Sequence, residues 1–355
     1  MKIRFGVVAA AVVTWGLHDI PLALGALDPG PRVRRSPHYR DGSFHNFDEG
    51  GTARPDIRRA ARETLRRGRR RPLLPVPVVA PEFGPPGDLE VCWLGHGTSL
   101  VDIEGKRVLF DPVFAERCSP SRLLGPQRVH EVPVPVEDLP RIDVIAISHD
   151  HYDHLDLPSV KALLRTQTAP FVVPLGVGAH LERWGVPTSR IIELDWEESA
   201  VVAGLKVTAT PSHHFSGRAL KRNPTLWCSF VVAGGRRRVY YSGDSGYFPG
   251  YARIGAAHGP FDVTLMQVGA YSPAWPDVHM TPEEGLAAHR ELRGGLFVPV
   301  HWGTFVLAPH PWDDPPNRVR AEAKILDLRV AVPRPGERIT VDDPPEPDGW
   351  WDSLG

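Results

Sequence analysis

The densest group of reactive side chains lies in one short segment, directly after an apolar run. Residues Ser148-His149-Asp150-His151-Tyr152-Asp153-His154 contain the pattern His-x-His-x-Asp-His, and Val144-Ile145-Ala146-Ile147 precedes them. Imidazole nitrogens and carboxylate oxygens are ligands for hard or borderline cations. A polar surface turn has no need of four such groups within six residues. The segment therefore predicts a metal-binding loop at the end of a buried strand.

Three further segments place histidine or aspartate after a predicted strand. They are Pro211-Ser212-His213-His214-Phe215, Gly243-Asp244-Ser245-Gly246 and His301-Trp302-Gly303. Each alone is a weak signal, but functional groups gather on loops at strand ends because the sheet holds those loops in place. Together the four segments predict one site. His213 and His214 are adjacent and point to opposite faces of an extended segment, so only one of them is expected to be a ligand.

The elements that must hold these loops begin near residue 88. Alternating or continuous apolar runs predict strands at 89–94, 99–103, 107–110, 144–148, 171–174, 205–210, 227–232, 238–242, 263–268 and 296–300. Helices are expected at 157–168, 177–184, 250–257, 281–292 and 318–328, with Thr281 and Glu284 forming a capping box. Two runs of strands, each followed by alternating helices and strands, predict two facing sheets with helices outside.

Length and composition limit the function classes. The 355 residues allow one large domain and a tail, since domains commonly hold about 100–200 residues. The formal net charge is −1, so no global field favours nucleic acid, and none is expected as a partner. The three cysteines form no CxxC pair and no disulfide framework (Cys92, Cys118 and Cys228).

The ends of the chain differ from its centre. Residues 1–27 combine a basic start with short apolar runs, which fits a signal peptide, an anchor in the membrane interface, or a buried or swapped arm equally well. Residues 28–87 read as an irregular, arginine-rich extension with a helix at 56–71. Its basic residues would each contribute about 1 kcal/mol of attraction to anionic lipid, unless the helix is simply solvated. The tail, 342–355, is expected to lie along the surface.

The four ligand segments, in this order, resemble the metallo-β-lactamase superfamily over residues 88–328, within a hydrolase domain of residues 88–341. The resemblance implies an α/β (α+β) fold, an αββα four-layer sandwich with a metal site at one edge of the sheets. One divalent metal ion would take His149, His151 and His213 or His214, and a second would take Asp153, His154 and His301. Asp244 would bridge them. Such ions lie about 3.5–4 Å apart and share a hydroxide. Zinc is the default, although iron and manganese suit the same ligands.

A narrower resemblance lies in further motifs. Trp93-Leu94-Gly95-His96-Gly97-Thr98-Ser99, Phe110-Asp111-Pro112-Val113-Phe114 and His279-Met280-Thr281-Pro282 look like the family of N-acylphosphatidylethanolamine-hydrolysing phospholipase D and its bacterial relatives. The family places an aromatic residue after the ligand histidine, so Phe215 favours His214. It also places a histidine at His279, near the substrate phosphate. Asp111 is expected to accept a hydrogen bond from a ligand imidazole, and the role of His96 stays open.

The resemblance implies hydrolysis of N-acylphosphatidylethanolamine-like lipids to phosphatidic acid and an N-acylethanolamine, with the metal-bridging hydroxide attacking phosphorus. Asp153, Asp244 and His279 would take part directly. The expected partners are a phospholipid substrate and a membrane surface, with a homodimer left open. The expected location is at a membrane or exported, with the cytoplasmic face not excluded. The alternatives are a hydrolase of lactones, amides, thioesters or another phosphodiester, and a non-enzymatic scaffold on the same fold.

Overall fold

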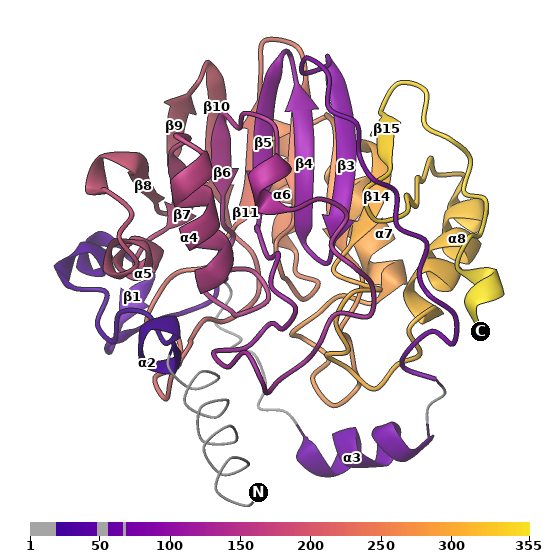
Figure 1. Ribbon diagram of the computed structural model, residues 1–355, viewed down its shortest axis with the longest axis horizontal. Helices are drawn as coiled ribbons and strands as arrows, with labels where there is room; N and C mark the ends of the chain where they lie inside the picture. Colours follow the sequence, from indigo (N-terminus) through magenta and orange to yellow (C-terminus); the bar gives the residue numbers. More distant parts are fainter. Residues whose placement is uncertain (1–18, 48–55, 67–68) are drawn as a thin grey trace, which may run out of the picture.

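Two β-sheets lie face to face at the centre of the molecule, and helices cover their outer faces (Figure 1). The computed structural model describes residues 19–47, 56–66 and 69–355. The αββα sandwich expected from the sequence is confirmed, as is every predicted strand and helix from residue 88 onward, with ends that differ by a few residues. The sequence did not predict the short strands β8, β9 and β15, which are defined below.

Both sheets mix antiparallel and parallel strands. The first has seven strands in the order β15 (Arg338–Thr340), β3 (Leu89–Gly95), β4 (Thr98–Ile103), β5 (Lys106–Phe110), β6 (Val144–Ala146), β7 (Phe171–Pro174) and β8 (Ile191–Leu194). The second has six in the order β14 (Gly294–Val300), β13 (Phe261–Gln267), β12 (Arg238–Tyr241), β11 (Ser229–Ala233), β10 (Leu205–Thr210) and β9 (Ser199–Val202). Strands β5 to β8 run parallel, as do β12 to β14, so within each set the carboxyl ends meet at one edge.

The helices close the outer faces of the two sheets. The first sheet packs against α4 (Leu157–Thr166) and α5 (Val177–Arg183), and the second against α6 (Gly250–His258), α7 (Pro282–Glu291) and α8 (Asp314–Leu326). Thr281 caps α7 in the predicted box, because its side chain accepts from the Glu284 backbone while the Glu284 side chain accepts from the Thr281 backbone. This cap fixes the chain directly after His279.

Strand β3 shows how the pattern builds two cores. Its residues Val91 and Trp93 point between the sheets, whereas Cys92 and Leu94 point to the opposite face and join the cluster under α4 and α5. Successive side chains of a strand face opposite sides, so a strand with a core on both faces must be apolar throughout. The sheet is therefore buried on both faces and offers a rigid base for the loops at its edge.

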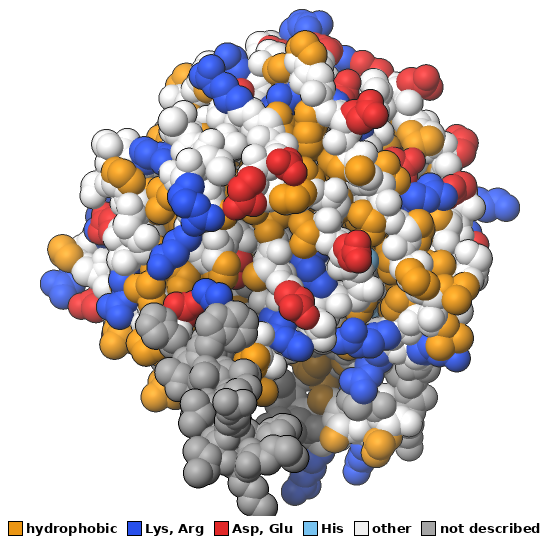
Figure 2. Space-filling view, viewed as in Figure 1, with side chains coloured by type: hydrophobic (Ala, Val, Ile, Leu, Met, Phe, Trp, Pro, Cys, Tyr) orange, Lys and Arg blue, Asp and Glu red, His pale blue; other side chains and the backbone are white. Residues whose placement is uncertain are grey.

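The N-terminal part packs onto this body. It contains α2 (Ile20–Ala23), the 3-10 turn η1 (Pro31–Arg35), the hairpin of β1 (Tyr39–Arg40) and β2 (Ser43–Phe44), and α3 (Ile57–Arg66). Val33 and Phe44 enter the core between the sheets. The helix expected at 56–71 is shorter, and basic side chains gather around it at the lower margin of the surface (Figure 2).

The leader or anchor expected over residues 1–27 falls mostly on residues 1–18, outside the described part of the chain. Residues 19–27 pack on the domain, where the Trp184 Nε1–H donates to the Leu22 carbonyl at 2.7 Å. Within the described residues, the structure contains no helix with the length and apolar character needed to cross a bilayer.

The C-terminal tail lies along the surface over residues 342–348, as expected, but its end is buried in the domain. Trp350 and Trp351 are 7% and 1% exposed, and their rings lie 5.7 Å and 6.2 Å from the ring of Trp302. Each indole N–H is satisfied, Trp350 by the Val332 carbonyl and Trp351 by Asn317 Oδ1. The large apolar surface that the two indoles bury holds the end of the segment on the domain despite its acidic, proline-rich composition. The tail thus supports the residue that follows His301.

Candidate metal centre

The segment that follows β6 is a tight loop at the edge of the first sheet. Its His154 and Leu155 backbone N–H groups both donate to the His151 carbonyl, at 3.1 Å and 2.8 Å, which closes the turn. Asp156 then caps α4 by accepting from the Ser159 backbone N–H at 3.0 Å. A buried strand on one side and a capped helix on the other therefore hold the loop.

A first cluster gathers three imidazoles and one carboxylate. His149 Nε2 lies 2.9 Å from His151 Nδ1, and His214 Nε2 lies 3.3 Å from the same atom. Asp244 Oδ2 is 3.8 Å from His149 Nε2 and 3.6 Å from His214 Nε2. All four ligand atoms lie within 4.8 Å of one another. Nitrogen lone pairs that converge in this way need a cation or a proton between them.

A second cluster lies beside the first. Asp153 Oδ2 is 3.3 Å from His301 Nε2 and 3.6 Å from His154 Nε2. His96 also belongs to this group, with its Nε2 at 2.9 Å from the same Asp153 oxygen. No role could be assigned to His96 from the sequence, because the turn Gly95-His96-Gly97 carries no ligand spacing. The available signals were its position after β3 and its place in the motif of residues 93–99 that resembles the phospholipase family.

Asp244 lies between the two clusters. Its Oδ2 is 3.2 Å from His154 Nε2, and its Oδ1 is 3.1 Å from His301 Nε2. His154 Nε2 and Asp244 Oδ1 are buried and make no hydrogen bond within the described part of the chain. Buried polar atoms without partners are rare in folded proteins, and these two belong to the residues at which the two clusters meet. The residues therefore fit a pair of divalent cations with Asp244 between them.

Asp111 orients one of these ligands. Its Oδ2 accepts from His154 Nδ1 and from the Tyr241 hydroxyl, both at 2.6 Å. Ser148 donates to the same carboxylate through its backbone N–H and its hydroxyl, again at 2.6 Å. Because the Nδ1 proton of His154 is held here, Nε2 is the atom that would bind a cation beside Asp244. This is the arrangement that metal-binding histidines require.

The two clusters differ in the protonation of their imidazoles. Burial lowers the pKa of His149 and of His214 well below the usual value, so both rings are neutral near pH 7. Burial alone would raise the pKa of Asp244, but the imidazoles of His154 and His301 hold that pKa well below the usual value. Burial alone would lower the pKa of His154 and of His301, but the carboxylates of Asp244 and Asp153 raise both, so a cation entering the second cluster would displace a proton from each of these rings.

His279 lies over Asp244 at the mouth of the site. Its Nδ1 is 3.9 Å from Asp244 Oδ2, and its ring lies 5.3 Å from His214 and 5.2 Å from His301. The side chain keeps 13% of its surface exposed, whereas those of His214 and His301 keep 1% each. Burial lowers the pKa of His279 to about 4, so the ring is neutral near pH 7 and can donate one N–H.

Of the two adjacent histidines, His214 belongs to the first cluster and His213 does not. His213 is outside both clusters, with its ring 6.5 Å from that of Phe248. His214 is held by its backbone N–H, which donates to Asn46 Oδ1 at 3.0 Å, and by its Nδ1, which lies 3.1 Å from the Val278 carbonyl oxygen. Asn46 belongs to the N-terminal extension and could not be predicted from the sequence.

Several site residues adopt the left-handed backbone conformation. The φ angles of His96, Asp111 and His301 are 53°, 39° and 65°. Such values cost energy for residues with a side chain and persist where the surrounding structure imposes them. Here each residue turns the chain sharply at the end of its strand. The turn aims its side chain into the site.

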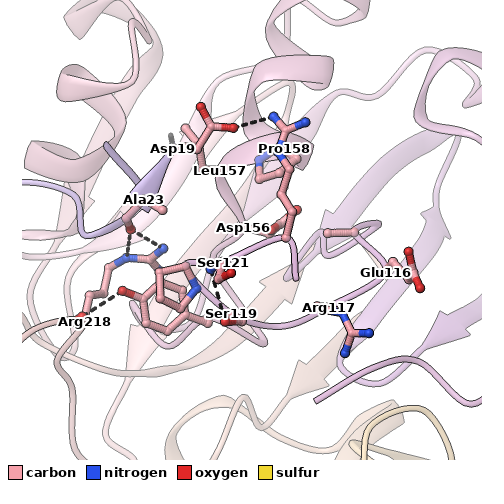
Figure 3. Close-up of a pocket in the computed structure, with 14 residues that line it drawn as sticks. Asp19, Ala23, Glu116, Arg117, Ser119, Ser121, Asp156, Leu157, Pro158 and Arg218 are labelled. Atoms are coloured by element: carbon pink, nitrogen blue, oxygen red, sulfur yellow. Dashed lines mark hydrogen bonds and ion pairs between the residues drawn. The ribbon is translucent and has the colours of Figure 1, made fainter. Parts of the chain in front are cut away.

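A cavity of about 250 Å³ lies beside the loop, lined by none of the cluster residues. Tyr152, which stands between His151 and Asp153 in the sequence, forms part of its wall. Figure 3 shows Arg218 at one side of this cavity, directed toward the Ala23 carbonyl, to which its Nη2 donates at 2.8 Å. Ser119 and Ser121 lie on the opposite loop (Figure 3).

Known proteins are similar to this chain in sequence and in fold. Residues 106–302, which include every ligand expected from the sequence, match the beta-lactamase superfamily domain. An uncharacterized protein of Mycobacterium tuberculosis is 48% identical over 99% of this chain and 98% of its own length. The N-acyl-phosphatidylethanolamine-hydrolyzing phospholipase D 1 of Caenorhabditis elegans is 38% identical over 65% of this chain and 68% of its own length. The structure of Igni18, a metallo hydrolase from Ignicoccus hospitalis, is similar with a TM-score of 0.56 and 24% identity, over 71% of this chain and 97% of that chain, which supports the fold alone.

Proposed function

The chain belongs to the metallo-β-lactamase superfamily and is a metal-dependent hydrolase, and we propose that it hydrolyses N-acylphosphatidylethanolamine-like phospholipids to phosphatidic acid and an N-acylethanolamine. The observation that carries the proposal is the similarity to the Caenorhabditis elegans phospholipase over 65% of the chain. The complete set of donors in both clusters supports hydrolysis rather than a scaffold role.

The side chains divide the work between binding and positioning. His149, His151 and His214 would hold one cation, Asp153, His154 and His301 the other, with Asp244 shared. When bound, two divalent cations, zinc by default, supply a water of lowered pKa as nucleophile and neutralise charge on the phosphoryl oxygens.

The phosphate is oriented by the residue at the mouth of the site. A neutral His279 imidazole can donate an N–H to a phosphoryl oxygen, and it is aligned by the capped start of α7. A helix N-terminus also favours an anion nearby. His279 would therefore bind the substrate without carrying a charge of its own that competes with the cations.

The test is identification of the products. The full-length protein is given N-acylphosphatidylethanolamine in detergent micelles, and the lipids are analysed by mass spectrometry. We expect phosphatidic acid and N-acylethanolamine from the wild type and neither from Asp244→Ala. A lactone, an amide and a thioester are offered in parallel. Hydrolysis of one of these with no phosphatidic acid would overturn the proposed substrate and keep the metal centre.

A further inference from the structure

Two loops beside the cavity carry exposed leucines on the side of the molecule where the ligand loops lie. We call residues 117–124 and 217–222 the leucine loops. Leu220 is 106% exposed, Leu124 is 67% exposed and Leu123 is 36% exposed. A single exposed leucine needs no explanation, but these three stand on two loops that line one cavity, and we call them the leucine patch. Exposed apolar groups that gather in this way mark interaction sites.

The leucine loops adjoin one another and the His-x-His-x-Asp-His segment, residues 148–154, which we call the metal loop. Residues of both line the cavity of Figure 3, the first loop through Ser119 to Arg122 and the second through Arg218. The Arg218 Nη1 donates to the Asp150 carbonyl at 2.6 Å, and the Gly217 backbone N–H donates to Asp150 Oδ1 at 2.7 Å. The second loop is thus tied to a residue of the His-x-His-x-Asp-His segment.

The charge of these loops favours an anionic partner. The two ranges contain four arginines and one lysine, with no aspartate or glutamate. Arg218 is buried and Arg122 pairs with Asp19, while Lys221 and Arg222 stand exposed beside Leu220. Exposed leucines next to basic side chains are the combination that binds the interface of an anionic bilayer.

Helix α3 extends the same surface on the other side of the site. Its Arg58, Arg59 and Arg62 are exposed, and Leu65 is 87% exposed. The Asp56 backbone N–H donates to the Ala274 carbonyl at 2.9 Å, which ties the start of the helix to the segment that carries His279. Figure 1 places α3 at the same end of the molecule as the ligand loops, and Figure 2 shows basic side chains along that margin.

We propose that the leucine loops dock on an anionic phospholipid bilayer, with Leu123, Leu124 and Leu220 entering the interface. Docking there brings the membrane surface to the metal loop, where a lipid substrate has to be delivered. The purpose of this docking rests on the proposed function. The docking itself does not, because it requires neither metal nor hydrolysis.

The test compares vesicle binding of matched variants of the full-length protein. Vesicles of phosphatidylcholine with phosphatidylglycerol, and of phosphatidylcholine alone, are sedimented with each protein. Leu124→Ser with Leu220→Ser removes two leucines from the patch. Val201→Ser with Ile325→Ser is the control, because these residues are 76% and 75% exposed on β9 and α8. Circular dichroism melting verifies that both double variants fold.

We expect the wild type to bind the anionic vesicles more tightly than the neutral ones. Each leucine lost from the patch should weaken binding about tenfold, and Lys221→Glu should weaken binding to anionic vesicles alone, by at least about fivefold. The control should bind as the wild type does. Docking is overturned if the wild type does not bind, or if the patch and control variants bind equally.

Parallel assays in detergent micelles separate the two proposals. Micellar hydrolysis of N-acylphosphatidylethanolamine without vesicle binding would overturn the docking surface alone. Vesicle binding without any hydrolysis would overturn the proposed substrate alone.

Discussion

Replacing Asp111 with asparagine should weaken one of two metal sites without touching a ligand. Asp111 accepts four hydrogen bonds, each 2.6 Å long, from His154, Tyr241 and the backbone and hydroxyl of Ser148. The asparagine NH₂ must replace one of the two carboxylate oxygens. If the NH₂ takes the place of Oδ1, it faces the Ser148 backbone N–H, so two donors point at each other and the backbone donor cannot rotate to another acceptor. If it replaces Oδ2 it favours the other tautomer of His154, whose proton then lies on Nε2.

The size of the effect follows from this geometry. Partners that orient a metal ligand typically contribute about 10–100-fold in affinity, or about 1.4–2.8 kcal/mol. A buried donor left without an acceptor costs about 1–3 kcal/mol of folding free energy in addition. We therefore expect Asp111→Asn to bind one metal equivalent normally and the second about 10–100-fold more weakly.

Competition with a chromophoric chelator measures both equivalents. Asp102→Asn is the control, because Asp102 is a buried carboxylate of the same sheet that pairs with Arg107 at 3.0 Å and contacts no ligand histidine. The control should lose stability and keep both metal affinities. Wild-type affinity of Asp111→Asn for both equivalents, or an equal loss in the control, would show that Asp111 does not orient His154 for metal binding.

Three further substitutions test other parts of the site. Asp244→Ala removes the carboxylate shared by both clusters, so the rate of hydrolysis should fall at least about 100-fold. Initial rates in metal-saturated buffer measure this fall, and a loss below about tenfold would contradict a shared ligand. His96→Ala removes the imidazole whose Nε2 lies 2.9 Å from Asp153 Oδ2, and it should weaken binding of the second metal about 10–100-fold in a chelator titration. His96→Gln keeps an N–H donor and should recover part of this affinity. Equal metal affinities in the two variants would exclude a donor role for His96. Trp351→Ala opens a cavity against Trp302 and should lower the free energy of unfolding by about 3–5 kcal/mol in urea denaturation, and a change below about 1 kcal/mol would show that the tail is not part of the core.

The part of the site that the sequence predicts best is the part encoded locally. His149, His151, Asp153 and His154 fall within six residues after a buried strand, so one segment carries both the ligands and the strand that positions them. The sandwich follows from hydrophobic periodicity, which is strong where strands are buried on both faces. The short edge strands β9 and β15 have little pattern of their own and form because a neighbour pairs with them.

What the sequence did not predict depends on contacts between distant segments. His96 meets Asp153 across 57 positions, and Asn46 reaches the His214 backbone across 168. The tail was expected on the surface from its composition, but the free energy of burying Trp351 is set by Trp302, a residue 49 positions away. No local pattern encodes such a pairing.

The proposed mechanism requires two metal ions that act together. The measurement is a titration of the chelator-treated, full-length protein with Zn²⁺, with bound metal and hydrolysis of micellar N-acylphosphatidylethanolamine followed in the same samples. This mechanism predicts two equivalents bound per chain and activity that appears chiefly as the second site fills. Full activity after one equivalent, or full activity with no metal bound, would contradict it.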